Sequence, residues 1–192
     1  MNNTTRSILL AGVGGQGIIR ASDILSLAMI EAGYDVRKSE VHGMAQRGGC
    51  VTSHVRYGKK VYSPMAKKGD VDILVSFEKL ETLRYLDYLK PDGKVIINDE
   101  EIYPPSVNLG DVQYPNNIIE LIAGHFSNPK VISASEMASR AGNHKTSNSA
   151  ILGALSLYLD IQMNFWESVL RNAFSEKILE ANLKAFNFGR NA

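Results

Sequence analysis

Cysteine is almost absent from this chain of 192 residues, in which Cys50 is the only one. A single thiol excludes an internal disulfide, and it is too few for an iron–sulfur cluster or a structural zinc site. We therefore expect no metal site in this chain. Any redox centre that works with the protein must be held elsewhere.

The sequence also lacks excess charge and long apolar runs. Its formal net charge is +1, with 44% hydrophobic and 21% charged residues, values typical of a globular protein. Nucleic-acid binding usually requires a strongly basic face, so we expect no nucleic-acid partner. The polar residues 1–6 precede only a short apolar run, which fits neither a signal peptide nor a membrane-spanning helix. We expect a soluble, cytoplasmic protein that does not bind a membrane.

Short apolar runs alternate with amphipathic segments along the chain. Strands are expected at 7–12, 35–41, 51–57, 72–77, 94–98 and 130–133. Helices are expected at 17–32, 79–89, 116–126, 147–159 and 165–186. This alternation predicts a three-layer, Rossmann-like α/β fold, with a mainly parallel sheet and C-terminal helices. Because the chain shows no repeat or linker, a single domain over 1–192 is expected.

A glycine-rich turn lies between the first expected strand and helix. Gly12, Gly14 and Gly17 match the dinucleotide-binding pattern, and Gly15 and Gln16 complete the turn. Glycines let the backbone approach a phosphate closely, while the following helix offers free N–H groups. These five residues are candidates for cofactor binding. The alternative is a turn that only permits tight packing of the strand against the helix.

Two basic residues, Arg37 and Lys38, stand about twenty residues beyond the glycine turn, where dinucleotide sites usually have an acid for a ribose hydroxyl. Basic side chains at that point favour an additional phosphate group. Arg37 and Lys38 are therefore further candidates for cofactor binding. A stand-alone oxidoreductase that binds NADP is one function compatible with this pattern.

The segment from His42 to Arg47 concentrates polar groups before a pair of glycines. His42, Gln46 and Arg47 offer an imidazole, an amide and a guanidinium, which suit an anionic substrate or cofactor group. They are the candidate catalytic residues. The alternative is a loop that contacts another subunit. In the next expected strand, His54 and Arg56 fall on a polar face that either extends this patch or is solvated.

The segment Glu40-Val41-His42-Gly43-Met44-Ala45-Gln46-Arg47-Gly48-Gly49, together with the glycine turn, resembles one family. This is the gamma-type component of 2-oxoacid:ferredoxin oxidoreductases, closest to the small (beta) subunit of the indolepyruvate branch. The resemblance extends from about residue 8 to 186. It implies that the chain is an enzyme subunit, inactive alone, whose residues 14–17 face the pyrophosphate of coenzyme A.

The same resemblance implies the partners. A larger alpha subunit carries thiamine diphosphate and [4Fe–4S] clusters, and the complex converts an aryl 2-oxoacid to an acyl-CoA while it reduces ferredoxin. A pyruvate, 2-oxoglutarate or 2-oxoisovalerate enzyme is the alternative substrate class. A purely structural subunit is a third hypothesis.

Three features late in the chain have simpler interpretations. The segment 142–148, which contains His144, Lys145 and Asn148, resembles the family's asparagine-containing helix start, and a plain helix cap is the alternative. Asn182 stands among apolar residues and is expected to be either a hydrogen-bonded interior amide or an interface contact. Trp166 is expected to serve packing.

Overall fold

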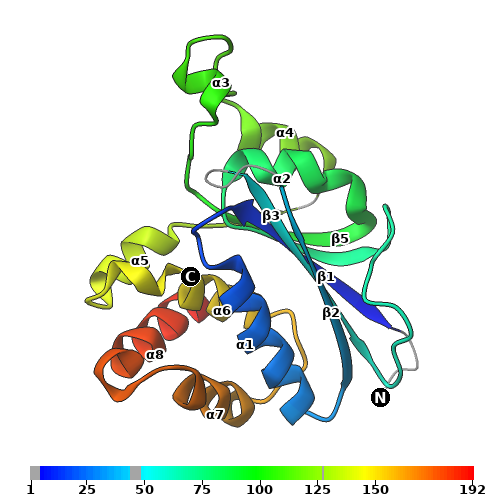
Figure 1. The fold of residues 1–192 in the computed structure, drawn as a ribbon, viewed down its shortest axis with the longest axis vertical. Coiled ribbons are helices and arrows are strands. Elements are labelled where there is room, and N and C mark those ends of the chain that lie inside the picture. Colours follow the sequence, from blue (N-terminus) through cyan, green and yellow to red (C-terminus); the bar gives the residue numbers. More distant parts are fainter. Residues whose placement is uncertain (1–4, 44–48, 127) are drawn as a thin grey trace.

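A six-stranded sheet runs through the computed structural model, which describes residues 5–43, 49–126 and 128–192 (Figure 1). The strands are β1 (Arg6–Val13), β2 (Asp35–His42), β3 (Cys50–Gly58), β4 (Val71–Ser76), β5 (Leu89–Asn98) and β6 (Lys130–Ile132). Their order is β2-β3-β1-β4-β5-β6. The strands β1, β4, β5 and β6 are parallel, whereas β3 is antiparallel to both β1 and β2. The predicted mainly parallel sheet is confirmed, with one reversed strand.

Helices cover both faces of this sheet. They are α1 (Ile18–Glu31), α2 (Lys79–Tyr85), α3 (Pro105–Asn108), α4 (Ile118–His125), α5 (Ala134–Arg140), α6 (Ser147–Ser156), α7 (Met163–Ala173) and α8 (Glu176–Arg190), with the 3-10 turns η1 (Leu86–Tyr88) and η2 (His144–Thr146). The helices α1 and α5 to α8 pack on one face, and α2 and α4 pack on the other (Figure 1). The three-layer prediction is confirmed. Among the residues that the structure describes, no helix combines the length and the apolar character needed to cross a membrane.

The helix expected at 165–186 is divided in two. The helix α7 ends at Ala173 and α8 begins at Glu176, so the prediction of one continuous helix was wrong. Ser175 occupies the position before α8, and serine is common there because it leaves helical backbone geometry easily. The short helix α5 was not predicted.

The first strand has no solvent-facing side. Ile8 and Leu10 pack into one apolar cluster, with α1 and the C-terminal helices. Leu9 and Ala11 pack into the other, with α2 and α4. Burying a Leu or Ile side chain stabilises a protein by about 1.5–3 kcal/mol. The continuous apolar run therefore places β1 at the centre of the sheet.

The polar face predicted for the third strand is not solvated. His54 is 3% exposed, and Thr52 on the same face is buried as well. The segment that follows β3 folds over these side chains: the Ala66 amide donates to His54 Nδ1 at 3.4 Å. Arg56 is half-buried and donates to the carbonyl oxygens of residues 63 and 65. The prediction of a solvated face was wrong because the alternation identifies two faces and cannot show what covers them.

The C-terminal helices α6 and α8 cross at contact distance between their backbones. A Cβ atom added to Gly153 would lie 1.9 Å from the carbonyl oxygen of Phe186, and one added to Gly189 would lie 1.8 Å from that of Ala150. Any side chain at either position would force the helices apart. Only glycine permits this crossing.

Two packing predictions for these helices are confirmed. Trp166 is fully buried, with its ring 5.3 Å from that of Phe186. Asn182 is 2% exposed; its Oδ1 accepts from Ser149 at 2.6 Å, and its Nδ2 donates to the Ile178 carbonyl at 2.8 Å. Both side chains stabilise the C-terminal layer.

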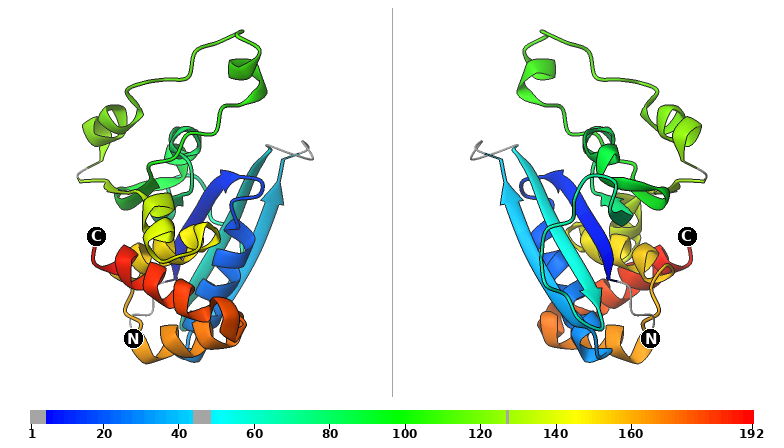
Figure 2. Two further views of the ribbon diagram at one scale, coloured as in Figure 1. Left: turned by 90° about the vertical axis from the view of Figure 1, so that its left-hand side faces the viewer. Right: turned by 90° about the vertical axis from the view of Figure 1, so that its right-hand side faces the viewer.

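A segment between β5 and α4 projects from the body of the protein. It comprises residues 103–113, includes α3, and is called the arm below. The arm extends beyond α2 and α4 in all three directions of view (Figures 1 and 2).

Candidate functional site

The glycine turn lies at the carboxyl end of β1, where the chain topology changes direction. From β1 the chain crosses through α1 to β2 on one side, whereas β4 lies on the other side of β1. Such a switch point is where α/β sheets usually bind ligands. The Gly14 amide donates to the Gly49 carbonyl at 2.9 Å. The turn is therefore joined to the start of β3.

The backbone of the turn leaves the first helical amides open to a ligand. Gly15 and Gly17 have φ angles of 100° and 80°, a left-handed conformation that favours glycine. Gly17 precedes α1, which has neither a side-chain cap nor an acidic residue in its first turn. The first amides of a helix have no acceptor within the helix, and the helix dipole attracts negative charge to them. This end of α1 is suited to an anion.

Two residues of the turn also serve the fold. A Cβ atom on Gly12 would lie 2.8 Å from the Cβ atom of Phe77, so close packing requires glycine there. Gln16 accepts from the Val13 amide at 2.8 Å and donates to the Phe77 carbonyl at 2.8 Å. Packing therefore explains why residue 12 is glycine, and hydrogen bonds within the fold occupy the amide group of Gln16. Cofactor binding by the turn stays a prediction.

A cavity of about 420 Å³ opens beside the turn. Its polar lining includes Asn98, Glu100, His144, Lys145 and Asn148. Asn98 ends β5, and Glu100 follows it by two residues; the other three come from η2 and the start of α6. The fold thus brings the late asparagine-containing segment against the glycine turn.

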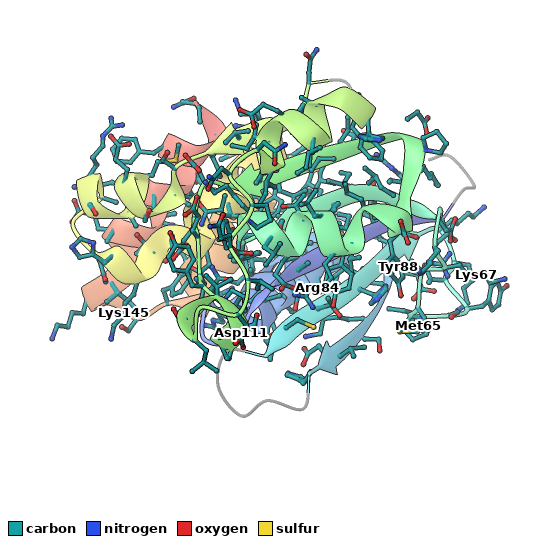
Figure 3. The ribbon with its side chains drawn as sticks, turned by 90° about the horizontal axis from the view of Figure 1, so that it is seen from above. Met65, Lys67, Arg84, Tyr88, Asp111 and Lys145 are labelled. Carbon is teal, nitrogen blue, oxygen red and sulfur yellow. The ribbon has the colours of Figure 1, made fainter. Side chains whose placement is uncertain are left out.

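The η2–α6 segment presents two basic groups and one amide to this cavity. His144 and Lys145 are exposed, and Lys145 is labelled in Figure 3. Asn143 accepts from the Lys145 amide at 3.0 Å, so the plain cap is supplied by Asn143. Asn148 Oδ1 is buried and has no hydrogen-bond partner among the described residues. Its Nδ2 would lie 2.9 Å from a Cβ atom on Gly17, which excludes larger residues there.

The sequence analysis did not identify Asn98 and Glu100 as site residues. Glu100 Oε2 accepts from Asn98 Nδ2 at 2.8 Å and from Gln16 Nε2 at 3.4 Å. Asn98 Oδ1 also accepts from the Ala134 amide at 2.9 Å. Both residues lie at the carboxyl end of a buried parallel strand, at the same sheet edge as the glycine turn. Their position after a buried strand was the sequence feature that could have identified them, because α/β sheets bind ligands at the carboxyl ends of their strands.

Arg37 and Lys38 do not lie at the glycine turn. In the sheet register Arg37 is opposite Arg56, which is opposite Ser7 near the start of β1. The turn begins five residues further along β1, about 16 Å away at the rise of a strand. Lys38 pairs with the carboxylates of Asp23 and Glu40. The structure gives no support to a shared phosphate site.

His42 lies at the same sheet edge as the turn. It is the last residue of β2, is exposed, and is opposite Val51 in the register. The Gly43 amide donates to the Cys50 carbonyl at 2.8 Å, which begins the connection to β3. Gln46 and Arg47 lie outside the described residues. A catalytic role for the three residues stays a prediction.

A second cavity, of about 230 Å³, lies between α2, the start of β3 and the base of the arm. Burial raises the pKa of Glu81, and its neighbour Arg84 opposes this, with the Arg84 Nε atom 3.1 Å from Glu81 Oε1. Cys50 Sγ lies 3.0 Å from the Tyr85 hydroxyl. Burial, followed by this contact, raises the pKa of Tyr85. Sequence analysis identified only the cysteine; Arg84 is labelled in Figure 3.

The fold and the site define a class: a three-layer α/β domain with an anion-compatible glycine turn at a topological switch point. The family model described as pyruvate ferredoxin/flavodoxin oxidoreductase matches residues 7–192. The chain belongs to this family.

Relatives in the family cover nearly the whole chain. The chain is 39% identical over 188 residues to indolepyruvate oxidoreductase subunit IorB of Pyrococcus horikoshii, covering 95% of this chain and 93% of that one. It is 38% identical over 191 residues to the same subunit of Archaeoglobus fulgidus, covering 96% and 94%. Identity falls to 27% with the pyruvate/ketoisovalerate common gamma subunit of Pyrococcus abyssi, with coverage of 91% and 89%.

Solved structures share the fold. The 2-oxoglutarate:ferredoxin oxidoreductase from Magnetococcus marinus, with 2-oxoglutarate, coenzyme A and succinyl-CoA bound, has a TM-score of 0.75 at 24% identity. It matches 99% of this chain, which spans only 31% of that longer chain. Pyruvate oxidoreductase subunit PORC from Thermotoga maritima has a TM-score of 0.74 at 20% identity, with coverage of 97% and 96%.

Proposed function

We propose that this chain is the small subunit of an indolepyruvate:ferredoxin oxidoreductase, which converts aryl 2-oxoacids to acyl-CoA and reduces ferredoxin. The observation that carries the proposal is the graded similarity. Identity is 38–39% with two subunits named for indolepyruvate and 27% with one named for pyruvate and ketoisovalerate, over similar coverage. A larger subunit, an aryl 2-oxoacid, coenzyme A and ferredoxin are its proposed partners.

Within that complex, the cavity beside the glycine turn holds a phosphate-bearing part of coenzyme A. The uncapped start of α1, the Lys145 ammonium and the imidazole of His144 support this assignment. Glu100 is an opposing charge in the same cavity, and its Oε2 already accepts from Asn98 and Gln16. The cavity fits a phosphate group with adjoining hydroxyl or amine donors, for which Glu100 offers an acceptor.

The redox cofactors are assigned to the larger subunit. Thiamine diphosphate supplies the carbanion chemistry of decarboxylation, and [4Fe–4S] clusters carry the electrons to ferredoxin. Within residues 5–43, 49–126 and 128–192, no group of three or more His, Cys, Asp or Glu side chains is placed to hold a metal ion. This chain's part is to bind coenzyme A and to complete the enclosed active site.

Reconstitution tests the proposal. The purified chain would be mixed with its larger subunit and assayed for ferredoxin reduction with indolepyruvate, pyruvate and 2-oxoglutarate, with and without coenzyme A. We expect activity only in the mixture, greatest with indolepyruvate and dependent on coenzyme A. Activity of the isolated chain with NADP would contradict the proposal, and so would a mixture that prefers pyruvate.

The coenzyme A site has its own test in the reconstituted enzyme. Lys145→Ala should raise the KM for coenzyme A about tenfold, because a charge-assisted contact contributes about 1.5 kcal/mol. The KM for indolepyruvate should not change. Lys67→Ala, which removes an exposed lysine at the opposite side of Figure 3 from Lys145, is the matched control. Equal KM values for coenzyme A in both variants would remove Lys145 from the site.

A further inference from the structure

The arm has a rigid base. The buried carboxylate of Glu78 binds the residues that flank the arm on both sides. Glu78 Oε1 accepts from the Ile102 amide at 3.2 Å and from the Tyr114 hydroxyl at 2.5 Å. Glu78 is 1% exposed and also caps α2 through the Glu81 amide. The rings of Tyr103 and Tyr114 lie 5.2 Å apart. The two ends of the arm are thus fixed to each other and to α2.

The tip of the arm is ordered by its own hydrogen bonds. The amide of Leu109 donates to the carbonyl of Pro105 at 2.9 Å, and that of Asp111 donates to Ser106 at 3.0 Å. Gly110 adopts the left-handed conformation that ends a helix in this way. The tip therefore presents a fixed surface.

That surface is apolar and carries negative charge. Leu109 is 78% exposed and Val112 is 55% exposed, on a segment that projects from the molecule (Figure 2). Asp111 is the only charged residue in the arm and is labelled in Figure 3. Large apolar side chains held out by a rigid support are typical of a surface that another protein covers.

The chain segment that contains the arm carries charge of one sign. Residues 95–129 include no lysine or arginine, and their acidic members are Asp99, Glu100, Glu101, Asp111 and Glu120. Lys79 pairs with two of them at the base of the arm, with its Nζ 3.0 Å from Asp99 and 2.6 Å from Glu101. The net charge of the segment with Lys79 stays negative. A partner surface that matches it would be an apolar pocket bordered by lysine or arginine.

We propose that the arm is a preformed docking element that inserts Leu109 and Val112 into a basic-rimmed apolar pocket of the larger subunit. The proposal rests on the proposed function, which supplies the larger subunit. Ferredoxin is a less suitable occupant if its docking face is acidic, because two acidic surfaces repel. Binding of the arm to ferredoxin is instead an outcome that the test can detect.

The test measures the affinity of the full-length chain for the purified larger subunit, by titration calorimetry at low and at high salt. Leu109→Ser should weaken binding at least about tenfold, as loss of a central apolar anchor does. Asp111→Lys should weaken binding more at low salt than at high salt, because salt screens the new repulsion. Leu157→Ser is the matched control, since Leu157 is 48% exposed and lies outside the arm.

The outcomes separate the two proposals. If the parent chain binds the larger subunit and the arm variants bind equally well, the docking role of the arm is overturned while the proposed function stands. If the parent chain itself does not bind, both fail. A variant that keeps its affinity for the larger subunit but loses ferredoxin binding also overturns the docking proposal. Thermal melts of each variant should match the parent, because the substituted side chains Leu109 and Asp111 are exposed.

Discussion

On one face of the sheet, α6 and α8 approach until the backbones of Gly153 and Gly189 determine their separation. On the other face, a cavity of about 230 Å³ lies between α2, the start of β3 and the base of the arm. The first layer is joined by apolar contact and glycine. The second layer has an apolar cluster of its own, but at the arm its segments are joined through one buried carboxylate, Glu78, and the groups that donate to it.

This difference shows how the protein divides its tasks. In a closely packed apolar layer, a change in the volume of almost any side chain lowers the stability. The C-terminal layer therefore contributes mainly to the stability of the fold. A buried carboxylate is destabilised when one of its hydrogen-bond donors is lost. Because several donors can bind it at once, it can also hold two distant chain segments together. The second layer can therefore support a projecting arm. The glycine turn lies between the two layers.

The largest effect is expected at the α6–α8 crossing. Gly153→Ala should lower the free energy of unfolding by about 3 kcal/mol or more, because a methyl group cannot fit between two backbones without separating the helices. Gly124→Ala in α4 is the matched control. A Cβ atom there meets nothing within 4 Å, so alanine should leave stability unchanged or raise it by about 0.5–1 kcal/mol.

Urea unfolding followed by circular dichroism measures both variants. Equal effects in the two helices would contradict the contrast between the layers. The same curves test the single domain predicted over 1–192, since a single domain of this kind should unfold in one transition.

The second effect concerns the carboxylate in the other layer. Tyr114→Phe removes the hydroxyl that donates to Glu78, and it should lower the free energy of unfolding by about 1.5–3 kcal/mol, the usual range for a hydrogen bond to a charged group. Tyr62→Phe, at a side chain 90% exposed, should change nothing. If both variants have the stability of the parent, the Glu78 contacts do not hold the arm as described.

The smallest effect is a pH dependence on the same face. Burial, with a smaller contribution from Arg56, lowers the pKa of His54 from its usual 6.5. Because the folded state binds this proton less readily than the unfolded state, the stability is present above about pH 6.5 and declines as the pH falls toward the folded pKa. His54→Phe should show a weaker decline over that range. Unfolding curves at a series of pH values measure the difference, and parallel declines would contradict the prediction.

Local signals in the sequence determined most elements of the fold. The apolar run of β1, the glycines after it and the periodic pattern of α1 identified a strand, a turn and a helix because each depends on neighbouring residues alone. The apolar residues around Asn182 in the helix indicated an interior amide or an interface contact, and its hydrogen bonds show the interior amide. The family was also recognised from a short segment and the turn.

Strand order and contact between distant segments were decided only by the tertiary structure. The reversed strand β3 separates Arg37 from the glycine turn, although their spacing in the chain resembles that of a dinucleotide site. The fold instead brings Glu100 and Asn148 to the turn from segments far along the chain. The local pattern of apolar residues determines which segments form strands and which form helices. Which side chains share a cavity depends on the pairing of strands and on what covers each face, and burial over the whole molecule determines both.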